Sequence, residues 1–169
     1  MEALFVNGIL TNWEVKYGLT EYELDELEKI DKILLRKILN AHSKSPVESL
    51  YLETGILPLR TVIKSRRIMY LHHILTRKDN SLLLNFFQVQ NKFPTKNDWS
   101  ETVKKDLKDL NINIEFNILK KMSKLKFKKF LKIKAKQYAF KKNQISVINL
   151  SMIFLVLCVY QKKTHKTIL

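Results

Sequence analysis

Cysteine, glycine and proline are scarce in this sequence, and each shortage excludes a class of structure. The 169 residues contain one cysteine, Cys158, so neither a disulfide framework nor a cysteine-rich zinc site can form within the chain. Three glycines and three prolines are fewer than β-sandwiches, β-barrels and disordered chains usually contain. With an apolar fraction of 46%, the composition instead predicts a compact helical protein with a hydrophobic core. The cysteine content also suits an intracellular protein, nuclear or cytoplasmic.

Motifs of known catalytic and metal sites are also missing. The sequence has no glycine-rich phosphate loop, no Gly-x-Ser-x-Gly turn and no supported Cys–His pair. The histidines form no recognised metal-binding spacing with carboxylates. His73 falls on an apolar stripe of its expected helix, whereas His72 falls on a polar side, so His73 is the predicted core histidine. The N-terminal residues MEALFVNGIL lack the basic region of a signal peptide. We therefore expect no active site, no cofactor and no metal.

Positive charge is concentrated in the second half of the chain. Residues 1–80 contain 12 Lys/Arg and 11 Asp/Glu, whereas residues 81–169 contain 19 and 5, which together give the net charge of +15. This asymmetry predicts a basic surface for phosphates, nucleic acid or anionic lipid. The alternative is a solvated lysine surface without a partner.

N-cap signals divide the sequence into helices. Thr20 and Glu23 stand three residues apart and predict a capping box. In SPVESLYLETG, Ser45 is the expected N-cap, Pro46 the first helical residue and Gly55 the residue that ends the helix. Further N-caps are predicted at Ser81, Asp98 and Ser123.

These signals predict an all-α fold. We expect an irregular bundle of about six to eight helices with a basic C-terminal helix and an apolar tail. A linker near residues 91–97 suggests a boundary between two lobes. The expected domains are a helical lobe over residues 1–90, a basic helical lobe over 91–142 and a divergent apolar tail over 143–169.

An arginine pair lies within the mostly apolar segment LPLRTVIKSRRIMYLHHIL, residues 57–75. At 100° per residue the segment has two apolar stripes, which is typical of a helix at the centre of a bundle. Arg66 falls within the larger stripe, so it is expected to be buried and to pair with Glu53 or Glu48. Arg67 is expected to point elsewhere, where it contacts either a phosphate or a surface carboxylate. The candidate nucleic-acid-binding residues of this helix are Arg60, Lys64 and Arg67.

A lysine-rich helix supplies the main functional signal. Eleven lysines lie between Lys120 and Lys142, and aromatic residues are interspersed among them. Phe127 and Tyr138 share one side and are expected to anchor the helix to its own core, although aromatic side chains can also stack on bases. The lysines predict weak, salt-sensitive and sequence-independent binding to RNA or RNA–DNA duplex. The candidate residues are Lys121, Lys124, Lys128, Lys129, Lys132 and Lys136.

The tail contains an apolar run, ISVINLSMIFLVLCVY, at residues 145–160 with lysines on both sides. A membrane-spanning helix needs about 20 apolar residues, although about 17 can suffice. Three interpretations stay open: a tail anchor for a small membrane-associated protein, a buried helix or pair of strands, and non-native coding sequence.

The segments LEKIDKILLRKIL, SPVESLYLETGILPLR and SRRIMYLHHIL resemble the region after the polymerase palm in non-LTR (LINE- or jockey-type) retrotransposon reverse transcriptases. KNDWSETVKKDLKDLNI and the lysine-rich segment continue the similarity, which covers about Leu4 to Lys142. The sequence departs from the family near NWEVKYGLT, where a tryptophan near Lys16 is expected, and the resemblance stops at Asn143. The tail then reads like a frameshifted or read-through end.

The resemblance implies a thumb-like helical lobe and a C-terminal linker that hold template and primer. The aromatic-x-Asp-Asp turn of the polymerase does not occur in the sequence, so no enzyme activity is expected from this chain. The expected function is therefore that of a non-catalytic fragment of an RNA-directed DNA polymerase. The two rivals are a tail-anchored or membrane-surface protein that uses residues 145–160, and a helical protein-interaction module.

Overall fold

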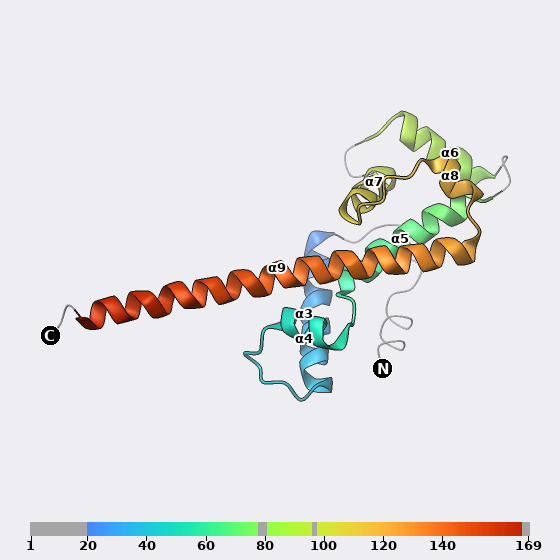
Figure 1. Cartoon of the computed structure of the whole chain (residues 1–169). Coiled ribbons are helices and arrows are strands. Elements are labelled where there is room, and N and C mark those ends of the chain that lie inside the picture. The colour runs from blue at the N-terminus through green and yellow to red at the C-terminus, as the bar shows by residue number, and fades with distance from the viewer. Residues whose placement is uncertain (1–19, 78–80, 96–97, 167–169) are drawn as a thin grey trace.

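The fold is all-α, as the sequence predicts. A computed structural model describes the backbone of residues 20–77, 81–95 and 98–166, and the side chains of these residues as far as Met152. Within these ranges the chain forms helices and no strands (Figure 1). The helices are α3 (Glu21–Ile38), α4 (Val47–Thr54), α5 (Leu59–Leu75), α6 (Leu82–Lys92), α7 (Trp99–Asp109), α8 (Phe116–Lys121) and α9 (Lys124–Lys166).

Most of the predicted helix ends are confirmed by hydrogen bonds. At the start of α3 the Glu23 amide donates to Thr20 Oγ1 at 3.3 Å, and the Thr20 amide donates to the Glu23 carboxylate at 2.8 Å. These two bonds form the predicted capping box. The amide of Leu84 donates to the hydroxyl of Ser81, the N-cap of α6, at 3.3 Å. Asp98 is the N-cap of α7 as expected, and Ser123 accepts a bond from the Lys126 amide at 3.4 Å.

The short helix α4 starts one residue later than predicted. Its N-cap is Pro46, not Ser45, and helical backbone begins at Val47. The carbonyl of Ser45 accepts a 3.0 Å hydrogen bond from the guanidinium of Arg36 on α3, so this residue belongs to the contact between the two helices. Gly55 ends α4 as predicted, in the left-handed conformation at φ +65° that glycine adopts without a steric penalty.

Helix α5 lies at the centre of the bundle, as its two apolar stripes predict. It packs against α3, α6, α7, α8 and α9. Ile68 and Leu71 are fully buried, and Ile63 is 1% exposed. Most of the circumference of this helix is therefore covered, which places its polar residues inside the fold as well.

One hydrophobic core crosses the predicted boundary near residues 91–97. Leu71 of α5 and Phe87 of α6 belong to the same buried cluster as Val103 of α7, Leu119 of α8 and Phe127 of α9. The two expected lobes therefore share a core. Two smaller clusters join α3 to α5 and α3 to α4.

Helix α9 is 43 residues long and continues from the lysine-rich segment through the apolar run. Its buried stripe, at i, i+4 spacing, is Phe127, Leu131, Ala135 and Ala139. This stripe packs on α4 and α5, whereas the C-terminal half of α9 projects beyond the other helices (Figure 1). Beyond the stripe the apolar side chains are exposed: Ile145, Ile148, Leu150 and Met152.

The expectation of a buried helix or a pair of strands at residues 145–160 is thus wrong for residues 145–152. This segment is helical but exposed, and it lies past the other helices that the structure describes (Figure 1). The side chains of residues 153–160 lie outside those described. Within the part of the chain that is described, no helix has a stretch long and apolar enough to cross a membrane.

A partly buried hydrogen bond joins α3 to α4 and leads to a prediction on the pH dependence of stability. The hydroxyl of Tyr51 donates to the carboxylate of Asp31 at 2.5 Å. Burial raises the pKa of Asp31 above its ordinary value, and the bond from Tyr51 partly opposes this effect. Tyr51→Phe is therefore expected to raise the pKa of Asp31 further, which a carboxyl NMR titration measures.

The exposed Tyr22 provides the matched control, because Tyr22→Phe should leave the Asp31 titration unchanged. A raised pKa means that the folded state binds the proton more tightly than the unfolded state. The resulting stabilisation is fully present below the ordinary Asp pKa of 3.8 and is lost as the pH rises through the folded-state value. An unchanged or lower Asp31 pKa in Tyr51→Phe would contradict this account.

Candidate nucleic-acid interface

The buried arginine of α5 is Arg67, not Arg66. Arg67 is 6% exposed, and its Nε and Nη2 donate to the Asp106 carboxylate of α7 at 2.7 and 3.2 Å. Arg66 is only half-buried, and its pairing with Glu48 or Glu53 stays a prediction. Two apolar stripes cover so much of the helix that hydrophobic residues alone do not show which arginine is enclosed. The deciding partner lies on α7, 39 residues away.

The electrostatics of this pair follow from its burial. Asp106 is 2% exposed, and burial raises the pKa of its carboxyl, while the hydrogen bond and the charge of Arg67 act in the opposite direction. Because the guanidinium is bound by the buried Asp106, the prediction that Arg67 faces outward, toward a phosphate or a surface carboxylate, is wrong.

The other two cations of α5 are also neutralised within the fold. Arg60 forms ion pairs with three carboxylates of α3, at 2.6 Å from Glu21, 2.5 Å from Asp25 and 3.0 Å from Glu28. The bond to Glu21 is the main reason why the pKa of Arg60 is raised.

Lys64 pairs with Asp109 of α7 and lies 5.5 Å from the centre of the Tyr138 ring on α9. Arg60, Lys64 and Arg67 therefore connect helices to one another. A cleft of about 1050 Å³ between α3, α5, α7 and α9 is lined by these same paired groups. The α5 cations of this cleft already have carboxylate partners, which removes the argument for assigning these three to a phosphate. The exposed Lys105 and Lys142 also line the cleft.

The prediction of the core histidine is wrong by one residue, as is the prediction of the buried arginine. His72 is 3% exposed, its Nε2–H donates to the carbonyl oxygen of Met122 at 3.0 Å, and its ring stacks on Phe127 at 4.4 Å. His73, the predicted core histidine, is exposed. Its remaining burial, followed by the charges of Arg77 and Lys124, lowers the pKa of His73. His72 is thus a structural link between α5 and the start of α9.

The lysines of α8 and α9 differ from the cations of α5. Glu115 is the last acidic residue of the sequence, so neither helix contains a carboxylate side chain. The predicted residues are all exposed: Lys121, Lys124, Lys128, Lys129, Lys132 and Lys136. We call these six residues the basic surface. Among the residues that the structure describes, none of the six forms an ion pair with a carboxylate, whereas ion pairs hold Arg60, Lys64 and Arg67.

Three of these lysines form a row along α9. Lys129, Lys132 and Lys136 are exposed on the side of α9 away from Phe127 and Leu131, as predicted. Their spacing of three and four residues repeats at about one helical turn of 5.4 Å. The row therefore presents ammonium groups at regular intervals over about 10 Å of the helix axis. Lys126, Lys141 and Lys142 are also exposed and extend the positive surface along the helix.

Over the part of α9 whose side chains are described, the aromatic residues divide into anchors and one exposed ring. Phe127 is fully buried, and Phe130 and Tyr138 are half-buried, which confirms that Phe127 and Tyr138 hold the helix on its core. Phe140 is 58% exposed. The helical period indicates that Phe140 is exposed. It follows the exposed Ile133 by seven residues, so both lie on the side of the lysine row.

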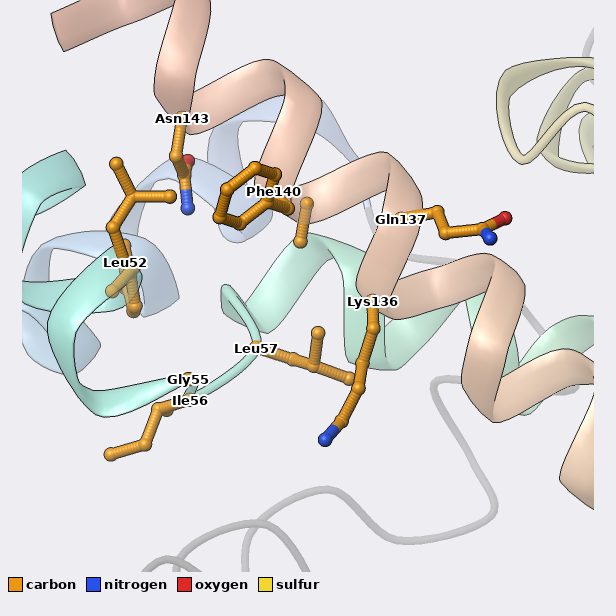
Figure 2. Close-up of a pocket in the computed structure, with 10 residues that line it drawn as sticks. Leu52, Gly55, Ile56, Leu57, Lys136, Gln137, Phe140 and Asn143 are labelled. Carbon is orange, nitrogen blue, oxygen red and sulfur yellow. The ribbon is translucent and has the colours of Figure 1, made fainter.

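An apolar pocket adjoins Phe140, between the turn that joins α4 to α5 and one side of α9 (Figure 2). Its volume is about 310 Å³. Leu52, Ile56 and Leu57 form one wall, and Phe140 of α9 forms the opposite one. Lys136 of the lysine row also lines this pocket, which makes the pocket and the basic surface neighbours.

The chain has no match among protein-family models, curated proteins or solved structures. The resemblance to retrotransposon reverse transcriptases stays a prediction, and the argument for function depends on the surface of α8 and α9.

Proposed function

We propose that this chain is a non-catalytic nucleic-acid-holding module that binds RNA or RNA–DNA duplex through the basic surface. By resemblance it is a fragment of the thumb and linker region of a non-LTR reverse transcriptase. One observation carries the proposal. Carboxylates of the fold hold Arg60, Lys64 and Arg67 of α5, while the six exposed lysines of the basic surface have no carboxylate partner among the described residues.

The expected mechanism is the release of counterions from the phosphate backbone. Each lysine that neutralises a phosphate frees a condensed cation, so affinity falls as the salt concentration rises. Helix α9 is anchored by its buried stripe of Phe127, Leu131 and two alanines, which fixes the lysine row relative to the bundle. Lysine ammonium groups are point charges that contact phosphates and do not identify bases, so the binding is independent of sequence.

Catalysis is not part of the proposal, because the sequence lacks the paired aspartates of the polymerase turn. The expected result is that the purified chain does not extend a primer. Nucleotide incorporation above that of a buffer control would contradict this statement.

The experiment that tests the proposal is a binding titration with a fluorescently labelled RNA–DNA hybrid, read by anisotropy. We expect binding that weakens at least tenfold between about 50 and 200 mM salt, since six phosphate contacts can account for about a thousandfold loss over that range. Hybrids of unrelated sequence should bind equally. An affinity that is insensitive to salt would contradict counterion release, and no detectable binding at low salt would refute the proposal.

A helical protein-interaction module is a second candidate, and the surface of α6 favours it. Leu82, Phe86, Val89 and Phe93 are exposed and follow the i, i+4, i+7, i+11 spacing of one helix face. Exposed apolar faces of this kind commonly bind other proteins. This candidate predicts neither salt-dependent nucleic-acid binding nor any effect of the lysines on complex formation.

A further inference from the structure

The pocket beside Phe140 is lined mainly by apolar side chains and is large enough for one small ring system. It is enclosed on one side by α4 and its turn and on the other by α9, and its volume of about 310 Å³ suits a small ligand. Gly55 lies at its edge, and a Cβ atom at this position would meet no other atom within 4 Å, so nothing closes the pocket there. The pocket is therefore open to a group that approaches along the surface.

The amide of Asn143 provides the polar feature of the pocket. Asn143 is 6% exposed, and its side chain lies on the pocket side of α9 beside Leu52 and Phe140 (Figure 2). The amide forms no hydrogen bond with any other residue that the structure describes. Its polar atoms still reach solvent through the open pocket, because Ser100 Oγ is the one described side-chain polar atom that is fully buried without a partner. The amide is therefore available to a ligand that offers a donor and an acceptor at its edge.

The surroundings of the pocket distinguish a nucleobase from an apolar protein side chain. Lys136 lines the pocket and belongs to the lysine row, so a phosphate held there would place its own base next to Phe140. A nucleobase has a flat face that stacks on aromatic rings and a polar edge that pairs with an amide. An aliphatic side chain would fill the pocket but would leave Asn143 without a partner.

We propose that this pocket accepts one unpaired nucleobase from a single-stranded end of the nucleic acid on the basic surface. The base stacks on Phe140, its polar edge bonds to the Asn143 amide, and the adjoining phosphate contacts Lys136. This inference rests on the proposed function and adds a preference for a duplex that has a single-stranded extension. Stacking tolerates every base, so the preference is for an unpaired base and not for a particular sequence.

The test compares three RNA–DNA hybrids with the same duplex: one blunt, one with a short single-stranded extension, and one whose extension is abasic. The abasic extension has the phosphates but no bases, so it isolates the contribution of stacking. We expect the intact extension to bind about tenfold more tightly than the abasic one. Phe140→Ala and, independently, Asn143→Leu should each reduce this ratio to near one. The natural sequence should quench the fluorescence of a 2-aminopurine base in the extension by stacking, and both variants should lose this quenching.

Phe86→Ala is the matched control, because Phe86 is 62% exposed, similar to Phe140, but lies on α6. This variant should keep the full ratio. Equal binding of the intact and abasic extensions by the natural sequence would overturn the inference and would favour a protein side chain as the occupant. Salt-dependent binding of the blunt hybrid would in that case leave the proposed function intact. Loss of binding to all three hybrids would refute the proposed function, and this inference with it.

Discussion

Arg67→Ala is expected to lower the free energy of unfolding by about 3–5 kcal/mol, because it leaves the Asp106 carboxylate buried without its partner. Both side chains are nearly inaccessible, and they are joined by two hydrogen bonds between α5 and α7. Urea denaturation followed by circular dichroism measures the change. Asp106→Ala should have an effect of similar size, since it leaves the guanidinium unpaired instead.

The double variant Arg67→Met, Asp106→Leu separates the cost of an unpaired charge from the value of the pair. Replacing both partners with apolar residues removes the unpaired charge, so most of the lost stability should return. The surface pair of Lys104 and Glu101 on α7 is the matched control, because its side chains are 33% and 45% exposed. Lys104→Met should cost less than about 1 kcal/mol. Comparable losses at the two sites would show that burial does not determine the effect.

Reversing the charges of the lysine row, with Lys129, Lys132 and Lys136 all replaced by glutamate, is expected to weaken binding to an RNA–DNA hybrid by about a hundredfold at about 0.1 M salt. The substitution removes three phosphate contacts and adds three charges that repel the backbone. All three side chains are exposed, so the fold should be unaffected. Anisotropy titrations measure the affinity, and circular dichroism verifies the helix content.

The matched control changes the same number of charges elsewhere. Lys37 of α3, Lys44 of the following loop and Lys108 of α7 are exposed lysines outside the basic surface. Replacing these three with glutamate changes the net charge by the same amount. Screening over a Debye length of about 10 Å limits the effect of distant charges, so the control should weaken binding by less than about fivefold. Equal losses in the two variants would mean that only net charge matters and that α9 is not the site.

The parts of the fold that depend on local chemistry could be predicted from the sequence. The capping box of Thr20 and Glu23, the N-cap at Ser81 and the left-handed Gly55 each require residues that are close in the chain. The exposed row of Lys129, Lys132 and Lys136 also follows from the helical period alone.

The errors concern side chains whose environment comes from distant segments. Arg66 and His73 are the residues predicted to be buried. In each case the adjacent residue of α5, Arg67 or His72, is the buried one. The partners that decide these cases are Asp106 and the Met122 carbonyl, which lie 39 and 50 residues away. No periodicity in α5 itself contains this information, because apolar residues occupy most of its circumference.

The exposed apolar segment of α9 was missed for a related reason. Hydrophobicity predicts that residues 145–152 are buried or in lipid, but burial also requires a neighbouring element. The buried stripe of α9 ends near Asn143, after the contact with α4, so Ile145 and Ile148 have none of the described helices beside them. The position of the end of a helix bundle depends on tertiary packing, and the sequence of one helix does not determine it.

The salt dependence of hybrid binding, compared between the natural sequence and the Lys129, Lys132 and Lys136 variant, is the most direct test of the basic surface. The slope of log affinity against log salt reports the number of neutralised phosphates, at about 0.9 per contact on a B-form DNA duplex and less on single strands. We expect the variant with three reversed lysines to have a shallower slope, which corresponds to the loss of about two to three phosphate contacts. A slope that is the same in both proteins would contradict the account, because the lysines of α9 would then not contact the phosphates.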